Sequence, residues 1–174
     1  MRVLGFKKEE ICILPPDIEL KIRIDKLKNA IAKDKLEGLQ SFCFIASAGT
    51  INMGTVDLLN DIADICEAEN LWFHIDGAYG GIAILYKKGA KALQGIQRAN
   101  FLTVDPHKWF YQPYEIGCLL VNKSSWLSGT FSEKLEYLRD IEGNESELNF
   151  YDYGTQLPRR FRALKFYMFI KHTV

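Results

Sequence analysis

Short apolar runs alternate with more polar stretches through the middle of the chain, and each run ends in small or polar residues. Continuous apolar runs of this length are typical of strands in the interior of a sheet. The runs that predict strands cover residues 42–48, 71–75, 101–104 and 116–121. We expect the first of these strands to be buried on both faces.

The segments between these runs carry apolar residues at helical spacing. In the clearest of them, Asp57 is expected to cap the N-terminus of a helix and Asn70 to close it. Further helical patterns cover residues 25–35, 90–97 and 158–171, and Pro158 would lie in the first turn of the last helix.

Strands that alternate with helices predict an α/β fold, a mostly parallel sheet with right-handed crossovers and helices on both faces. We expect residues 1–37 to form a connector and a helix, and residues 38–174 to form the part with the sheet. Parallel sheets bind ligands at the C-terminal ends of their strands. The loops after the first three predicted strands should therefore lie together, and they cover residues 49–54, 76–81 and 105–109.

The composition narrows the classes of function. Lys plus Arg and Asp plus Glu number 22 each, so no net charge attracts the 174-residue chain to nucleic acid or to a membrane. No apolar stretch is long enough to cross a bilayer and the N-terminus is charged, so we expect a cytoplasmic protein. The four cysteines are too widely spaced for a zinc or redox motif, and we expect reduced, mostly buried thiols.

Two reactive side chains stand at predicted strand ends. Lys108 follows one strand in Asp105-Pro-His-Lys-Trp109, and Asp76 ends the strand before it. A single lysine at such a place is most often a solvated surface charge. Together, however, the pair supplies what pyridoxal phosphate needs: an amine that forms a Schiff base with its aldehyde, and an acid that keeps its ring nitrogen protonated.

Two other sites can be drawn from neighbouring residues. His74, Asp76 and His107 are of metal-binding types, but no fourth ligand has suitable spacing, so we expect no metal site. Ser47 with His107 and Asp76 could form a hydrolase triad, but the sequence around Ser47 lacks the tight turn that exposes a nucleophilic serine. Pyridoxal phosphate is therefore the favoured ligand.

Four motifs in a fixed order carry a family resemblance. They are Ala48-Gly-Thr-Ile-Asn-Met-Gly54, Leu71-Trp-Phe-His-Ile-Asp-Gly-Ala-Tyr-Gly-Gly81, Asp105-Pro-His-Lys-Trp109 and Arg159-Arg-Phe-Arg-Ala-Leu-Lys165. With these motifs the sequence resembles the pyridoxal-phosphate-dependent amino-acid decarboxylases, which include the aromatic-L-amino-acid and glutamate decarboxylases. The resemblance implies that the chain is part of the large domain of the aspartate-aminotransferase-like fold, also called fold type I.

The resemblance also implies a role for each matching residue. Lys108 would form the Schiff base with pyridoxal phosphate, and Asp76 would pair with the ring nitrogen. Ala78 would pack against the ring. His107 would take part in catalysis beside the cofactor phosphate and the substrate carboxylate.

Three further positions match the family. Asp105 and Thr50 stand where family members contact or approach the cofactor. Tyr137 matches the loop tyrosine that returns a proton to the substrate after carbon dioxide leaves, so it is the expected general acid. The implied reaction converts an aromatic or acidic L-amino acid to its amine in a homodimer. The alternatives are a truncated, inactive remnant, or a pyridoxal phosphate enzyme of another type, such as an aldehyde synthase or a transaminase.

The chain also departs from the family pattern. Ile51 replaces a threonine that usually contacts the cofactor region, and Gly77 replaces an alanine. The family's upstream segment, which stacks a histidine on the ring and binds the phosphate, has no counterpart here, and neither has its C-terminal small domain. We therefore expect this chain alone to be a poor catalyst, because charge-assisted phosphate contacts contribute much of the cofactor's affinity.

Overall fold

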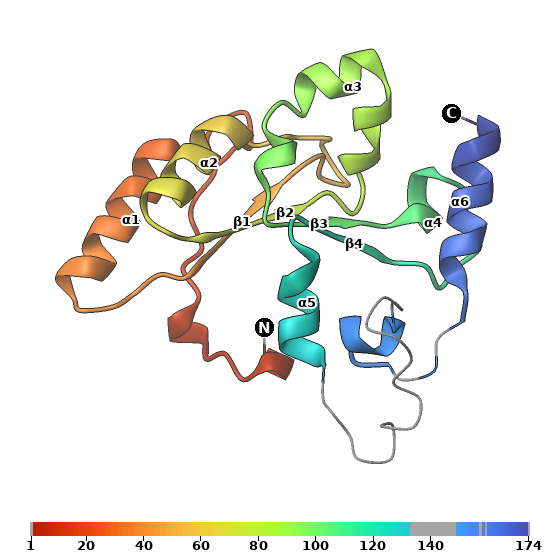
Figure 1. Cartoon of the computed structure of the whole chain (residues 1–174). Coiled ribbons are helices and arrows are strands. Elements are labelled where there is room, and N and C mark those ends of the chain that lie inside the picture. The colour runs from red at the N-terminus through yellow and green to blue at the C-terminus, as the bar shows by residue number, and fades with distance from the viewer. Residues whose placement is uncertain (1, 133–148, 157, 159, 174) are drawn as a thin grey trace. The chain divides into compact units, whose positions relative to one another are not determined.

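The computed structural model describes residues 2–132, 149–156, 158 and 160–173 (Figure 1). The chain divides into two compact units, Met1–Leu120 and Val121–Val174. The first unit contains most of the sheet and the loops at its strand ends.

The described strands form one sheet in the order of the chain. They are β1 (Cys43–Ser47), β2 (Trp72–Asp76), β3 (Phe101–Val104) and β4 (Cys118–Val121). β2 pairs in parallel with β1 and with β3. This register places Ser47, Asp76 and Thr103 side by side on the three strands. The predicted strands and the mostly parallel α/β fold are confirmed.

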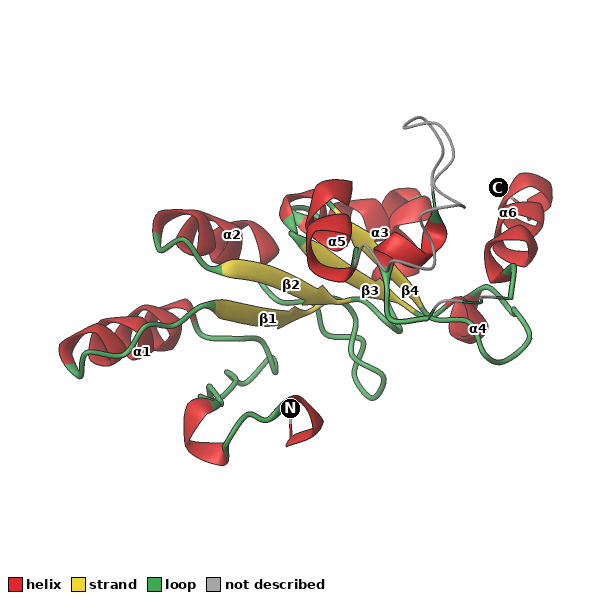
Figure 2. Cartoon of the chain, turned by 60° about the horizontal axis from the view of Figure 1, so that its bottom comes forward, coloured by secondary structure: helices red, strands yellow, loops and turns green. Residues whose placement is uncertain are grey.

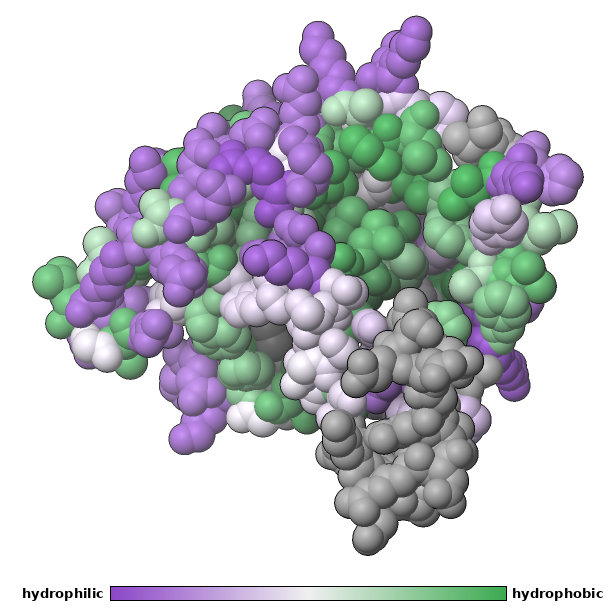
Figure 3. Space-filling model, in the orientation of Figure 1, coloured by the Kyte–Doolittle hydropathy of each residue, from purple (hydrophilic) through white to green (hydrophobic). Residues whose placement is uncertain are grey.

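Helices flank the strands of the first unit. The described helices there are α1 (Ile24–Leu36), α2 (Leu59–Ala68), α3 (Lys87–Ala92) and the single turn α4 (Pro106–Trp109). α2 and α3 lie on the same side of the sheet (Figure 2). Ala46, Phe73 and Ile75 are almost fully buried in the core that α2 completes. Hydrophilic side chains gather over the outer surfaces of α1 and α2 (Figure 3).

The opposite face of the same strands is half exposed. Ile45 keeps 46% of its surface exposed, whereas its neighbour Ala46 is fully buried. Trp72 of β2 lies flat against Phe101 of β3, with ring centroids 5.0 Å apart. The expectation that residues 42–48 are buried on both faces is therefore wrong, because successive side chains alternate and α2 packs on only one face.

Asn70 ends α2 as the sequence predicts. Its φ of 53° is left-handed. The backbone N–H groups of Asn70 and Leu71 donate to the carbonyls of Glu67 and Cys66, at 3.4 and 2.8 Å. This pair of hydrogen bonds satisfies carbonyl groups that the end of a helix otherwise leaves unpaired.

Asp57 does not cap α2. The helix begins at Leu59, and Leu58 occupies the cap position without a side-chain hydrogen bond. The Asp57 carboxylate is buried and accepts the backbone N–H groups of Ser47, at 2.7 Å, and of Ile22, at 2.8 Å. The predicted cap is wrong because these donors from two other segments take both carboxylate oxygens.

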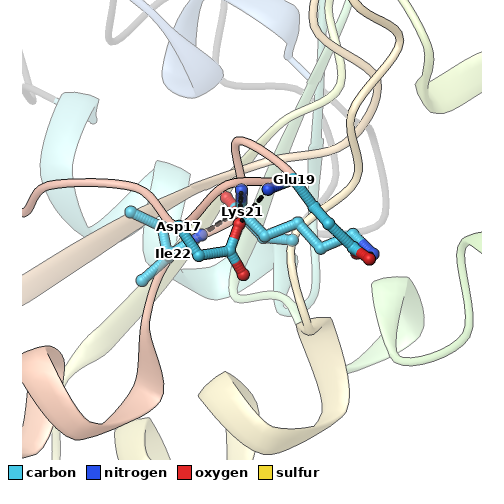
Figure 4. A network of polar contacts seen from close by, with 5 residues as sticks. Asp17, Glu19, Lys21 and Ile22 are labelled. Carbon is cyan, nitrogen blue, oxygen red and sulfur yellow. Dashed lines mark hydrogen bonds and ion pairs between the residues drawn. The ribbon is translucent and has the colours of Figure 1, made fainter.

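The segment that brings Ile22 to Asp57 is held by a turn of its own. Asp17 accepts the backbone N–H groups of Glu19, at 2.8 Å, and Lys21, at 2.9 Å (Figure 4). The turn lies inside an antiparallel bridge between Pro16 and Ile22. The N-terminal segment is thus ordered before α1 begins.

The helix expected over residues 90–97 is divided in two. α3 ends at Ala92, and a 3₁₀ turn covers Ile96–Arg98. Gly95 lies between them with a φ of 99°, and a Cβ atom there would lie 2.7 Å from the backbone nitrogen of Asn60. Glycine tolerates both conditions, so the chain turns here and passes close to α2.

The second unit contains α5 (Ser124–Phe131), a 3₁₀ turn (Phe150–Tyr153) and α6 (Arg162–Thr173) among its described residues. The placement of Pro158 in the first turn of the last helix is wrong. The backbone N–H of Arg162 donates to Arg160 in a tight turn, so α6 starts only at Arg162. No described helix is both long and apolar enough to span a membrane.

The four cysteines are free thiols, as expected. Cys66 is buried, and this burial raises the pKa of its thiol to about 12. Cys12 and Cys43 are exposed, so the expectation of mostly buried thiols is wrong. Cys12 lies outside the described strands, and Cys43 belongs to the half-exposed face of the sheet.

Candidate functional site

The three loops expected at one edge of the sheet do lie together. The backbone N–H of Ala48 donates to the Asp76 carbonyl at 2.8 Å, and that of Asp105 donates to the Ala78 carbonyl at 3.2 Å. A Cβ atom added to Gly80 would lie only 2.5 Å from the Cα atom of Gly49. Glycine at both positions therefore permits a backbone approach that any larger residue would prevent.

Asp76 presents a carboxylate at the C-terminal end of β2. Its side chain is exposed, and Oδ1 accepts the backbone N–H of Ala78 at 3.1 Å. In the part of the chain that the structure describes, no lysine or arginine forms an ion pair with Asp76. The second carboxylate oxygen can therefore receive a proton donor from a ligand.

Lys108 lies on α4, directly after β3. Pro106 occupies the first turn of this helix, where its missing N–H costs nothing, and Asp105 precedes it. The Lys108 Nζ atom lies 2.9 Å from Asp105 Oδ2, and both side chains are largely buried. Since Asp105 is hydrogen-bonded to Ala78, the lysine and the Asp76 carboxylate stand at the ends of adjacent strands.

His107 is oriented by the chain that follows α4. Its Nδ1 donates to the Ile116 carbonyl at 2.8 Å, and its ring meets the edge of Tyr114, with centroids 5.2 Å apart. The hydrogen bond places the proton of a neutral ring on Nδ1. Nε2 is then the ring atom left to meet a ligand.

Thr50 shapes the loop that follows β1. Its hydroxyl accepts the backbone N–H of Thr55 at 3.1 Å, and its carbonyl accepts that of Gly54 at 2.8 Å. The loop is closed at its far end by Asp57, whose carboxylate binds the Ser47 amide. Contacts within the loop therefore hold Thr50 in place. It directly follows Gly49, which lies against Gly80.

Two polar residues lie behind Asp76: the sequence suggested His74 only as a metal ligand, and it did not single out Thr103. His74 lies two residues earlier on the same side of β2, and its Nε2 is 3.2 Å from the Thr103 hydroxyl. Burial lowers the pKa of His74, and the charge of Asp76 partly opposes this change. The alternating pattern of the strands indicates that His74 and Asp76 share a face, but only the β2–β3 register reveals Thr103 beside them.

The two departures from the family pattern differ in their surroundings. Ile51 is 64% exposed in the loop after β1. Gly77 is buried, and a Cβ atom there would lie 2.9 Å from the Leu102 side chain and 3.0 Å from the Gly81 Cα atom. Leu102 therefore fills the space that an alanine at residue 77 would need.

The expected general acid Tyr137 and the motif residue Arg159 lie outside the described residues. Their roles stay predictions. Within the described residues, no group of three or more His, Cys, Asp and Glu side chains could hold a metal ion.

The donor set at the strand ends fits pyridoxal phosphate. The cofactor requires a primary amine for its aldehyde and an anion for its ring nitrogen, and both stand at this edge of the sheet. Among the described residues, Asp76 uses one carboxylate oxygen for the Ala78 amide, and the Lys108 amine is paired with the Asp105 carboxylate. An α/β sheet with this pair at its strand ends is typical of pyridoxal-phosphate-binding proteins.

The chain belongs to the pyridoxal-dependent decarboxylase family. Residues 2–173 match the family described as "Pyridoxal-dependent decarboxylase conserved domain". Pyridoxal phosphate is the cofactor of this family.

Named relatives agree with this assignment. An aromatic-L-amino-acid decarboxylase of Bacillus atrophaeus is 50% identical over 172 residues, which are 98% of this chain and 36% of the relative. An acidic amino acid decarboxylase of Homo sapiens is 35% identical over 173 residues, covering 95% of this chain and 32% of the relative.

Solved structures show the same fold. A structure of mouse CSAD in apo form matches with a TM-score of 0.89 and 28% identity, over 98% of this chain and 35% of that one. A structure of Oryza sativa TDC with PLP and tryptamine matches with a TM-score of 0.89 and 27% identity, over 98% of this chain and 36% of that one. The fold is that of the fold type I decarboxylases, and the chain spans about a third of the length of these relatives.

Proposed function

We propose that this chain carries the cofactor-binding centre of an amino-acid decarboxylase, with Lys108 as the covalent anchor of pyridoxal phosphate and Asp76 as the partner of its ring nitrogen. The observation that carries the proposal is the placement of these two side chains at the ends of adjacent parallel strands, joined through the hydrogen bond between Ala78 and Asp105. When bound, the cofactor withdraws electrons from the substrate's α-carbon and so eases the loss of carbon dioxide.

Asp105 prepares the lysine for its role. An ammonium group is not a nucleophile, so Lys108 must give up a proton before it reacts with an aldehyde. The Asp105 carboxylate, 2.9 Å away, orients the Lys108 side chain, and this ion pair must open before the neutral amine can react, because a neighbouring negative charge favours the ammonium form. Asp105 thus acts on Lys108 as well as standing where the family resemblance places a cofactor contact.

Asp76 and His107 orient the two ends of the ligand. The Ala78 amide fixes the Asp76 side chain through Oδ1, which leaves Oδ2 to accept the ring N–H. The Ile116 carbonyl fixes His107 through Nδ1. Because Nδ1 holds the proton of a neutral ring, Nε2 can donate to the cofactor phosphate or to the substrate carboxylate only when the His107 ring is doubly protonated. Ala78 and Thr50 would complete the contacts around the ring.

The substrate we propose first is an aromatic L-amino acid, because the relative of 50% identity is named for that class. Acidic amino acids come second, because the human relative is named for them. Tyr137 would protonate the substrate carbon after carbon dioxide has left. Assays with both substrate classes, measuring released carbon dioxide and amine, decide between them.

The central test is covalent trapping. The purified chain is mixed with pyridoxal phosphate, reduced with borohydride, digested and mapped by mass spectrometry. We expect a phosphopyridoxyl group on Lys108 in the wild type and in the exposed-site control Lys91→Arg, and none in Lys108→Arg. Labelling spread over several surface lysines, unchanged in Lys108→Arg, would contradict the proposal and support a catalytically inactive remnant.

A second reaction of the same cofactor has a specific observation in its favour. A phenylacetaldehyde synthase of Petunia hybrida is 30% identical over 98% of this chain. We expect the wild type to yield amine and Tyr137→Phe to lose most amine formation, because the phenol is the proposed proton donor. Aldehyde as the main wild-type product would favour this second reaction.

The proposal also includes a homodimer and a cytoplasmic location, as the family resemblance implies. Sedimentation equilibrium of the purified chain, with and without pyridoxal phosphate, measures the first. A purely monomeric species at micromolar concentration would contradict the dimer.

A further inference from the structure

The carboxylate proposed to meet the cofactor ring has two polar neighbours on the half-exposed face of the sheet. His74 precedes Asp76 by two residues on β2, so both side chains leave the strand on the same side. Thr103 stands beside Asp76 in the register of β2 and β3. Its hydroxyl lies 3.2 Å from His74 Nε2. The residue beside Asp76 in the register is thus hydrogen-bonded to the imidazole of His74.

Few ionisable side chains lie near His74 on the paired strands that the structure describes. Its register neighbours are Ile45 on β1 and Phe101 on β3, and neither can carry a charge. Among the described residues of the three paired strands, the other ionisable side chains are Asp76 and Cys43. Cys43 lies in the row of Trp72, one step further from the strand ends. Asp76 is therefore the only neighbouring strand residue that is charged at neutral pH.

Burial and charge act on the imidazole in opposite directions. Burial lowers the pKa of His74, and the negative charge of Asp76 raises it by a smaller amount. The ring is accordingly neutral at neutral pH and carries one N–H. When that proton is on Nε2, the Thr103 oxygen accepts it, and the hydroxyl hydrogen is directed to another acceptor.

We propose that His74 and Thr103 are positioning residues for Asp76: the neutral imidazole donates to the Thr103 hydroxyl, whose own hydrogen can then turn to the neighbouring Asp76 carboxylate and orient it toward the cofactor ring. This inference rests on the proposed function, since it concerns the same carboxylate. A protonated His74 would weaken the arrangement, because its positive charge would compete with the ring for Asp76.

The first experiment needs no cofactor. Long-range ¹H–¹⁵N NMR spectra of the apo chain report the tautomer and titration of the His74 imidazole, with His107→Gln and His172→Gln to assign the resonances of the three histidines. We expect Nε2 to be protonated, the His74 titration to move to lower pH in Asp76→Asn, and the tautomer balance to change in Thr103→Val but not in Thr103→Ser. A His74 ring that keeps the same titration in Asp76→Asn and the same tautomer in Thr103→Val would overturn the inference.

The second experiment separates this inference from the proposed function. With pyridoxal phosphate reduced onto Lys108, the absorbance of the ring against pH gives its proton affinity. We expect His74→Phe and Thr103→Val to lower that affinity about 2- to 10-fold, the value of one hydrogen bond, and Thr103→Ser to retain it. If the group is fixed on Lys108 and all variants titrate like the wild type, the inference fails and the proposed function stands. If the wild type takes up no cofactor, the proposed function fails and the NMR result alone decides the positioning role.

Discussion

The two faces of strands β1 to β3 are built from alternate residues of the same segments, yet they have different tasks. One face carries Ala46, Phe73 and Ile75, which are almost fully buried in the core with α2. The other carries Ile45, half exposed, and the polar group around Asp76. Burial on the first face stabilises the sheet and so fixes the strand ends. The second face is thereby free to hold polar side chains whose positions serve chemistry.

The difference between the two faces is tested most directly by truncating one isoleucine on each face. We expect Ile75→Ala to lower the free energy of unfolding by about 2–5 kcal/mol, because it opens a cavity in a closed core. Ile45→Ala should cost less than about 1 kcal/mol, because its side chain is already half exposed. Urea denaturation of both variants measures the difference. Equal losses would show that the two faces contribute alike.

A smaller effect is expected at Asp57, whose carboxylate joins the end of β1 to the N-terminal segment. Asp57→Asn replaces one acceptor with an amide donor that faces a backbone N–H of Ser47 or Ile22. We expect a loss of about 1–3 kcal/mol, the cost of leaving a buried donor unpaired. Asp61→Asn, an exposed position on α2, is the matched control and should change little. Amide hydrogen exchange at Ser47 and Ile22 should become faster in Asp57→Asn. Unchanged exchange rates would show that Asp57 does not hold these two N–H groups.

The smallest effect concerns pH. The folded chain lowers the pKa of His74, mainly through burial, so the unfolded chain binds this proton more readily. The contribution of His74 to stability is therefore complete above its unfolded pKa of about 6.5, and it is lost as the pH falls from there toward the lower folded pKa. The loss of stability that His74 causes as the pH falls below about 6.5 should be absent in His74→Gln. The same loss should remain in His172→Gln. Urea midpoints at several pH values measure it, and parallel curves for all three proteins would contradict the assignment.

Local patterns could predict much of this fold, and tertiary contacts explain the rest. Asn70 and the strand ends follow from residue types that act on their own backbone, so the sequence identified them. Asp57 looks like a helix cap in the sequence, but its partners, Ser47 and Ile22, are set by how distant segments meet. Gly95 likewise breaks a helical pattern because the chain passes close to Asn60.

The candidate site divides in the same way. Lys108 and Asp76 could be predicted because each directly follows or ends an apolar run, and parallel strands bring such ends together. Thr103 could not, because its role depends on the register of β3 against β2. The ion pair between Lys108 and Asp105 also required the geometry of α4, although the two residues are only three apart.

The account depends on one ring being held at both ends, by Lys108 and by Asp76. The most direct measurement is the ¹⁵N chemical shift of the ring nitrogen in ¹⁵N-labelled pyridoxal phosphate reduced onto the chain. We expect the ring nitrogen to stay protonated well above the pH at which the free reduced cofactor loses its proton. In Asp76→Asn the nitrogen should lose its proton at a lower pH than in the wild type, whereas Asp61→Asn should behave like the wild type. A ring nitrogen that titrates in the wild type as it does in the free cofactor would contradict the account.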